Sequence, residues 1–177
     1  MRVFIFFCVF VLFVQNGFAQ STNLLIKEIK IKKKAIDAFT KTADFQSIRF
    51  QDESGQETVL VIYMNNQLPV KLSVTNSVSS GKDQKTFYFD EIGCFYVEAF
   101  QTTFQRTPRW EEAKSQELGE IERNVSVEKI EKNYFYFKEG KLIEWSSDPS
   151  ISKTPDSFIK MEAQLIEEAE DLQTRLK

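Results

Sequence analysis

The feature that most restricts the fold of this chain is a change of hydrophobic period after residue 41. Up to that point apolar residues recur at helical spacing, and beyond it they alternate with polar residues in short runs. Turn-forming residues, mainly Asn, Gly, Ser and Asp, separate these runs. Such runs are typical of antiparallel strands joined by tight turns. We expect strands over residues 45–51, 57–64, 70–78, 85–90, 94–104, 127–137 and 141–145.

A helix is expected on each side of these strands. Residues 23–41 place apolar side chains near one helical face, namely Leu25, Ile29, Ile36 and Phe39. From Asp156, which can cap a helix, apolar residues recur at spacings of three and four. That stripe consists of Phe158, Met161, Leu165, Ala169, Leu172 and Leu176. We predict an α+β domain in which an antiparallel β-meander of about six strands is flanked by an N-terminal helix and a longer C-terminal helix packed on one face.

The first 19 residues have the three parts of a secretory signal peptide. Arg2 gives a positive start, residues 3–14 are all apolar, and Gly17 and Ala19 form a small-x-small pattern. As a helix, this apolar run spans about 18 Å, which is too short for a hydrocarbon core of about 30 Å. We expect cleavage near Ala19 and a single exported domain over residues 20–177, periplasmic or extracellular, with no transmembrane segment in the mature chain.

Composition excludes several classes of function. The chain has no histidine, so neither a Ser-His-Asp triad nor a His-containing metal site can form. The net charge of −3 becomes −4 when Arg2 leaves with the signal segment, whereas a nucleic-acid binder usually has a basic surface. Glycine-rich phosphate loops and calcium-loop patterns are absent from the sequence. We therefore expect no enzymatic activity, no cofactor, no metal and no nucleic-acid partner.

Export would leave Cys94 as the single cysteine, because Cys8 lies inside the signal segment. A lone cysteine cannot form an intramolecular disulfide. We expect its thiol to be buried, since an exposed thiol is a liability in an oxidising compartment and no histidine can activate it.

Three segments look like copies of one hairpin. Each has a tyrosine between apolar residues and then a polar turn, with the tyrosines at positions 63, 88 and 136. The intervals of 25 and 48 residues are close to one and two steps of 24. We interpret the longer interval as a repeat with one degenerate step. Unrelated hairpins can produce the same pattern, so the alternative that these segments are not repeats stays open.

The stretch Tyr134–Trp145, with the polar gap and acidic helix after it, resembles the end of uncharacterised small secreted proteins of Bacteroidota-type Gram-negative bacteria. The signal ending at residues 18–20 is similar to signals from that phylum. The Tyr-x-x-x-Gly-x-Leu hairpin from Tyr136 is also similar to MORN-like sheet repeats, although Gln67 and Ile92 replace its glycine in the other two segments. The resemblance implies export and the helix–meander–helix layout, and it implies no activity and no functional residues.

A long polar segment, residues 105–124, separates two expected strands. Connections of this length are usually functional, disordered or contain a short helix. It contains Trp110 close to Arg106 and Arg109, a combination common in protein and sugar recognition, although Trp110 can equally fold back onto the sheet. We therefore expect a non-enzymatic binding module whose partner is an unknown envelope protein or glycan. Its expected contact surface is the uncovered face of the sheet together with this segment, with Arg106, Arg109 and Trp110 as contact residues.

Two alternatives remain open. A small-ligand or glycan-binding domain would use sheet aromatics such as Tyr63, Tyr88 and Tyr136, and it requires these rings to face outward or into an open pocket. A carboxylate-based hydrolase requires two carboxylates across a cleft, about 5–10 Å apart, one with a raised pKa. The glutamates of residues 105–124 lie beside Lys and Arg, which is the opposite environment.

Overall fold

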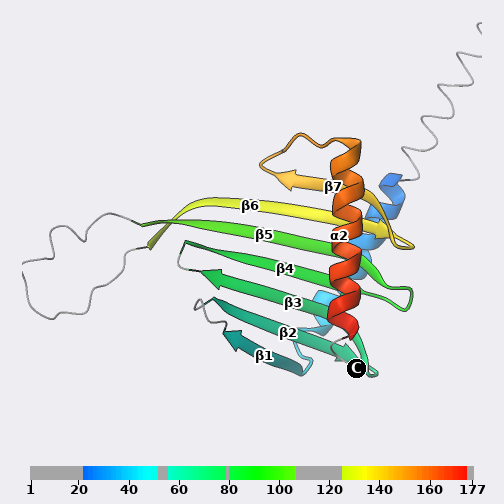
Figure 1. Cartoon of the computed structure of the whole chain (residues 1–177). Coiled ribbons are helices and arrows are strands. Elements are labelled where there is room, and N and C mark those ends of the chain that lie inside the picture. The colour runs from blue at the N-terminus through cyan, green and yellow to red at the C-terminus, as the bar shows by residue number, and fades with distance from the viewer. Residues whose placement is uncertain (1–21, 52–55, 79, 107–124, 175–177) are drawn as a thin grey trace, which may run out of the picture.

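The computed structural model describes residues 22–51, 56–78, 80–106 and 125–174, which form a seven-stranded sheet and two helices (Figure 1). Each strand pairs antiparallel with the next one in the chain, so the sheet is a β-meander. An N-terminal helix over residues 22–39 precedes it. The other elements are β1 (Phe45–Gln51), β2 (Glu57–Asn65), β3 (Leu68–Val78), β4 (Gly81–Phe89), β5 (Cys94–Arg106), β6 (Val125–Lys138), β7 (Lys141–Asp148) and α2 (Pro155–Thr174). The predicted fold class is confirmed, with seven strands in place of about six.

The two helices cover opposite faces of the sheet, and both cross the strands toward the end where the β2–β3, β4–β5 and β6–β7 turns lie (Figure 1). Leu165 and Ala169 of α2 are buried in the larger apolar cluster. Ile29 of the N-terminal helix belongs to a separate cluster on the other face. The prediction that the C-terminal helix packs on one face is therefore confirmed. The N-terminal helix covers the other face, so the expectation of an uncovered sheet face was wrong.

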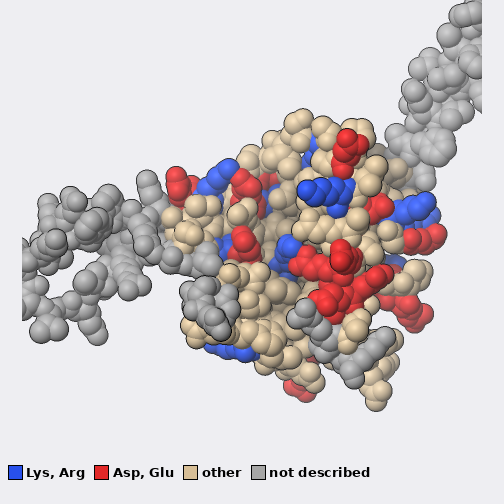
Figure 2. Space-filling view, in the orientation of Figure 1, with Lys and Arg blue, Asp and Glu red and all other residues tan. Residues whose placement is uncertain are grey.

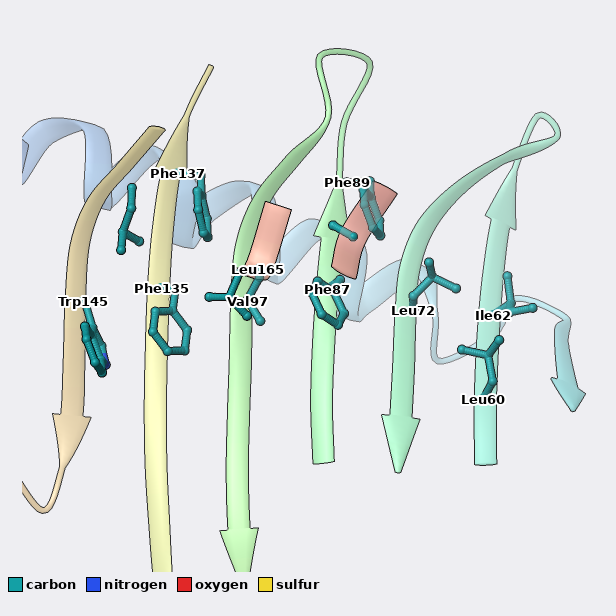
Figure 3. Packing of buried hydrophobic residues seen from close by; sticks show 12 residues of the cluster. Leu60, Ile62, Leu72, Phe87, Phe89, Val97, Phe135, Phe137, Trp145 and Leu165 are labelled. Atoms are coloured by element: carbon teal, nitrogen blue, oxygen red, sulfur yellow. The ribbon is translucent and has the colours of Figure 1, made fainter. Parts of the chain in front are cut away.

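Alternation along each strand separates these two clusters, because successive side chains of a strand point to opposite faces. Figure 3 shows the α2-side set, contributed by six consecutive strands and closed by α2. At its centre Leu72, Phe87 and Val97 have no exposed surface. Full burial of a large apolar side chain stabilises a fold by about 1.5–3 kcal/mol, so this face supplies most of the apolar stabilisation.

The apolar stripes of both helices agree largely with the sequence patterns. Five of the six predicted α2 residues pack in the α2-side cluster, namely Phe158, Met161, Leu165, Ala169 and Leu172, whereas Leu176 lies outside the described residues. On the N-terminal helix, Ile29 is buried with Ile26 and Ile36 beside it. Phe39 is 39% exposed, so the predicted stripe was wrong at that position.

Two of the tight turns have the backbone that their sequences favour. Asn66 and Gln67 join β2 to β3 with φ of 49° and 67°, and Glu139 and Gly140 join β6 to β7 with φ of 51° and 75°. Two-residue turns with both residues in the left-handed region match the twist of antiparallel strands. The turns predicted around these residues are thus confirmed.

The three tyrosine hairpins share one register. In each, the tyrosine pairs with the residue eight positions later, as in Tyr63↔Lys71, and the register shifts directly after the tyrosine. The extra residue of each bulge is Val70, Phe95 or Ile143. These hairpins are consecutive in the described sheet, and the described residues contain no degenerate copy between the second and the third. The longer interval arises because residues 107–124 connect β5 to β6.

The expected strands 70–78 and 85–90 leave residues 79–84 as a turn, and this turn was predicted too long. β4 already begins at Gly81, which pairs with Val78 on one side and Thr103 on the other. A Cβ on Gly81 would lie 2.5 Å from the Thr102 carbonyl oxygen. The glycine therefore allows β5 to approach closely, which is a common reason for glycine inside a strand.

Thr154, and not Asp156, caps α2. The backbone N–H of Ser157 donates to Thr154 Oγ1 at 3.2 Å, and the backbone N–H of Thr154 donates to Ser157 Oγ at 2.9 Å. This reciprocal pair is a capping box. Pro155 takes the first helical position, where a missing N–H costs nothing, and Asp156 lies in the first turn, where the helix dipole favours an acid.

Candidate functional site

A row of side chains crosses the sheet on the face covered by the N-terminal helix. Strand register places its members opposite one another in successive strands: Phe45, Tyr63, Lys71, Tyr88, Tyr96, Tyr136 and Glu144. We call these seven residues the tyrosine row. The ring centroid of Tyr96 lies 5.5 Å from that of Tyr88 and 5.0 Å from that of Tyr136. Lys71 Nζ lies 5.9 Å from the Tyr63 ring centre and 5.1 Å from that of Tyr88, so cation–π attraction joins the rings that it separates.

Lysines of the N-terminal helix lie over these rings. Lys33 Nζ is 5.6 Å from the Tyr88 ring centre, and Lys30 Nζ is 5.8 Å from the Tyr136 ring centre. Long lysine stems can cover apolar surface while the ammonium group stays near water. The helix therefore docks on the aromatic row partly through its charged residues, which is why so few of its apolar residues are buried.

Asp37 connects the helix to the sheet. Its Oδ1 accepts hydrogen bonds from Lys71 Nζ at 2.7 Å and from Tyr88 Oη at 3.0 Å. Its Oδ2 lies 2.9 Å from Lys33 Nζ, one turn earlier in the same helix. One half-buried carboxylate thus joins two cations and a phenol that come from three different elements.

Glu98 of β5 completes this network from the sheet side. Its Oε1 lies 3.1 Å from Lys33 Nζ and accepts a hydrogen bond from Tyr96 Oη at 3.2 Å. Its Oε2 accepts a hydrogen bond from Tyr88 Oη at 3.5 Å. Lys33 therefore lies between the carboxylates of Asp37 and Glu98.

These contacts keep Lys33 and Asp37 charged and Tyr88 protonated around neutral pH. Burial lowers the pKa of Lys33, but its hydrogen bonds to Asp37 and Glu98 outweigh burial, and the net pKa lies above its ordinary value. Burial raises the pKa of Asp37, but hydrogen bonds from Lys71, Lys33 and Tyr88 outweigh it, and the net pKa lies below its ordinary value. Burial and the nearby carboxylates raise the pKa of Tyr88. A general acid or base works best with a pKa near the working pH, so this arrangement favours docking of the helix over proton transfer.

Acid should weaken the network because Asp37 titrates with a lowered pKa. A carboxyl group with a lowered folded-state pKa stabilises the fold above its unfolded pKa of about 3.9, and that stabilisation is lost as pH falls through the folded pKa. We expect the free energy of unfolding to fall below pH ~4, by about 1 kcal/mol for this group because solvent screens it partly. Urea denaturation of wild type and Asp37→Asn at a series of pH values measures this contribution.

Two results decide that prediction. Asp37→Asn should show a smaller loss of stability between neutral and acid pH than wild type. Lys71→Gln should move the loss to higher pH, because one of the bonds that lowers the pKa of Asp37 is gone. An unchanged pH dependence in Asp37→Asn would contradict the assignment.

A groove of about 330 Å³ opens across the hairpin-turn end of the sheet, between the two helices. Leu25 and Ile29 border it from the N-terminal helix, and Ile166 and Ala169 border it from α2. Apolar side chains from the strands form its floor, including Phe89, Phe95 and Phe137. The turns between β4 and β5 and between β6 and β7 close its outer side.

Charged residues surround this apolar floor. Glu28, Glu139 and Glu170 line the groove, and none of them forms an ion pair within the described part of the chain. Lys32 Nζ lies 2.7 Å from Asp90 Oδ2 and so fixes the N-terminal helix against the β4–β5 turn. Lys138 also lines the groove, so its apolar floor is bordered by four acidic and two basic side chains, an excess of negative charge.

Cys94 lies in the wall of the groove as a free, partly buried thiol. Its Sγ donates a weak hydrogen bond to the Tyr96 carbonyl oxygen at 3.8 Å. Burial raises the pKa of the thiol to about 12. Because the thiolate is the reactive form, this cysteine is held in its unreactive state at neutral pH.

The structure brings the three predicted tyrosines into one row, but it does not expose all of them. Tyr88 is 1% and Tyr136 is 5% exposed, and Tyr63 is half-buried. The small-ligand alternative requires these rings to face outward or into an open pocket, whereas the N-terminal helix covers Tyr88 and Tyr136. Arg106 is the last residue of β5, and Arg109 and Trp110 lie outside the described residues.

Sequence reasoning missed the charged half of the tyrosine network, namely Lys33, Asp37, Lys71 and Glu98. The i,i+4 spacing of Lys33 and Asp37 was a usable signal for a local ion pair. The partners from β3 and β5 gave no such signal, because only strand register places Lys71 and Glu98 beside the helix.

Comparisons with known proteins add no relative: no family model, no curated protein and no solved structure matches this chain. None of the helices in the described ranges is both long enough and apolar enough to cross a membrane. Within the same ranges, no three potential metal-ligating side chains of His, Cys, Asp or Glu form a group.

Proposed function

We propose that this protein is an exported, non-enzymatic module that binds a partner protein through the groove at the hairpin-turn end of the sheet. The single observation that carries the proposal is the convergence of both helices and two turns around an apolar floor of suitable size. Binding sites are typically concave and mostly apolar, with a few polar groups that fix orientation. Export rests on the N-terminal signal pattern, which lies outside the described residues.

The charge around the groove indicates which kind of segment would bind there. Glu28, Glu139 and Glu170 supply negative charge at the border, and Figure 2 shows that acidic side chains also gather on the neighbouring surface of α2. Electrostatic complementarity between surfaces selects partners and speeds association. A peptide segment that carries an apolar side chain next to Lys or Arg fits this combination best.

The chemistry of the titratable groups supports a binding role over catalysis. The cysteine thiol and the tyrosines with shifted pKa values stay protonated at neutral pH, and the chain has no histidine. A catalytic acid, base or nucleophile is normally held near its working pKa or activated by a neighbouring base.

Charge reversal at the groove tests the proposal. We expect the double variant Glu139→Lys/Glu170→Lys to lose at least about tenfold in affinity for a partner, since each lost or reversed contact of this kind costs about 1 kcal/mol or more. Crosslinked capture from the envelope and medium of the exporting cell would identify the partner, and titration calorimetry with that partner would give the affinity. Glu167→Lys is the matched control, because Glu167 is exposed on α2 and does not line the groove.

Equal affinity of the double variant and the control would contradict the groove assignment. A third variant, in which a short Gly-Ser linker replaces residues 107–124, tests the contact residues expected from the sequence. Loss of the partner in that variant alone would place the site at Arg109 and Trp110 instead.

A small-ligand role is the second candidate, and one observation favours it. The groove volume of about 330 Å³ falls within the range of small-molecule sites, about 300–1,000 Å³. A glycan bound on the buried rings of Tyr88 and Tyr136 would require the N-terminal helix to leave the sheet. The groove is therefore the expected site for either ligand class. If protein capture fails and a small-molecule screen finds binding, the small-ligand role is the correct one.

A further inference from the structure

β1 is an edge strand with an open side. It is the first strand of the sheet and pairs with β2 alone among the described strands (Figure 1). All seven of its residues are exposed. Its pairing with β2 runs from Phe45 to Gln51 without a bulge, so the open side is a regular row of backbone N–H and C=O groups.

The opposite edge of the sheet is occupied by the chain's own residues. At β7 the backbone N–H of Leu142 donates to Glu162 Oε2 of α2 at 2.7 Å. The carbonyl oxygen of Trp145 accepts a hydrogen bond from Lys153 Nζ, in the segment that leads to α2. In the described part of the chain, neither helix and no strand other than β2 makes a comparable bond to β1. The chain's own residues therefore hydrogen-bond to the β7 edge and leave the β1 edge open.

β1 also has few of the devices that usually protect an edge. Soluble proteins place lysine, proline or bulges on such strands to prevent pairing with other chains. β1 has none of these and has one charged residue, Arg49, which lies 3.5 Å from Glu57 of β2. Its apolar residues are widely accessible, with Phe45, Ile48 and Phe50 being 59%, 40% and 52% exposed.

We propose that β1 pairs antiparallel with β1 of a second copy of this chain, about a two-fold axis at Ile48. Strand register and charge together select this occupant and this register. Centred on Ile48, all seven residues pair and Arg49 faces Ser47 of the second copy. If the two-fold axis lay at Arg49 instead, the two Arg49 side chains would face each other, and opposed like charges are destabilising. A shift by one residue would send side chains to the wrong faces of the joined sheet.

The apolar side chains support the same register. Ile48 pairs with Leu60 of β2, a buried member of the α2-side cluster, and Phe50 lies on the same face. In the two-fold pair, Ile48 faces Ile48 of the second copy, and each Phe50 becomes a diagonal neighbour of the opposite Ile48. Pairing therefore extends the apolar cluster across the edge and covers side chains that one copy leaves exposed.

The first test is the oligomeric state of the protein as the expressing host processes it. We expect sedimentation analysis over a wide range of concentrations to show a monomer–dimer equilibrium. Ile48→Lys should weaken dimerisation at least about tenfold, because it introduces opposed charges at the centre of the pair. Ile159→Lys is the matched control and should dimerise like wild type. Ile159 is 68% exposed in the first turns of α2, and α2 begins beside β7, at the opposite edge of the sheet from β1 (Figure 1).

Crosslinking tests the register without relying on a destabilising variant. In the proposed pair, directly opposed residues have Cα atoms about 4.5–5.5 Å apart, which suits a disulfide. Ile48→Cys should form a covalent dimer under mild oxidation, and Phe45→Cys, which faces Gln51 of the second copy, should not. A wild-type monomer at all concentrations, or equal crosslinking in both cysteine variants, would overturn the proposal. The proposal would also be wrong if the protein stayed monomeric and β1 paired with an added strand peptide, because a foreign segment would then occupy the edge in place of a second copy.

Discussion

Tyr88→Ala should lower the free energy of unfolding by about 3–5 kcal/mol, the usual range for deleting a large buried aromatic side chain. Tyr88 is 1% exposed, and its ring centroid lies 5.5 Å from that of Tyr96 and 6.5 Å from that of Phe95. Its hydroxyl donates to Asp37, which also holds Lys33 and Lys71. Removal of this side chain therefore weakens the sheet core and the docking of the N-terminal helix together. Denaturant unfolding measures the total loss.

Tyr88→Phe separates the two contributions. It keeps the ring and removes the bond to a charged carboxylate, which costs about 1.5–3 kcal/mol for bonds of this kind. Amide hydrogen exchange should show faster opening of residues 22–39 in both variants, because the hydroxyl contacts the helix directly. A loss below about 1 kcal/mol for Tyr88→Ala, or unchanged exchange in the helix, would contradict the role given to the network.

Leu165→Ala should cost about 2–5 kcal/mol, because it removes the most deeply buried side chain of α2. Leu165 is 2% exposed and packs on the aromatic residues of the α2-side cluster (Figure 3). Polar contacts on either side position this part of the helix, namely Glu162 with the backbone of Leu142 and Glu168 with Lys85. The cavity left by the substitution therefore cannot close easily by a shift of the helix. Thermal and urea unfolding measure the effect.

Ile159→Ala provides the comparison within the same helix. Ile159 is 68% exposed, so its truncation should change the free energy of unfolding by less than about 0.5 kcal/mol. Similar losses in the two variants would show that α2 covers the sheet through a different face from the one described.

Local sequence predicted most of the secondary structure. The strand β1 was predicted with its observed bounds, and the remaining strands were displaced at their ends by a few residues. Asn66 and Gly140 tolerate positive φ, which made the β2–β3 and β6–β7 turns predictable. Gly81 misled the prediction because glycine serves both turns and close backbone approach, and the Thr102 carbonyl that requires it comes from another strand.

The candidate sites were far less predictable. The groove needs contributions from both helices and two turns, so no short pattern in the sequence can reveal it. The tyrosines were identified, but the helix that buries Tyr88 and Tyr136 ends at residue 39, far from both in the sequence. Their burial therefore could not be read from the neighbouring residues. The exposed state of β1 depends on its position at the sheet edge, which alternation of side chains does not determine.

By itself, the sequence determined the kind of elements, their order and most of their turns, because hydrophobic period and turn residues act over a few neighbouring positions. Tertiary structure alone decided that the helices take opposite faces, that Lys33 and Asp37 meet Lys71 and Glu98, and that β1 is left open. The physical reason is that both faces of this sheet carry large apolar or aromatic side chains and each must be covered, whereas no local pattern records which helix covers which face.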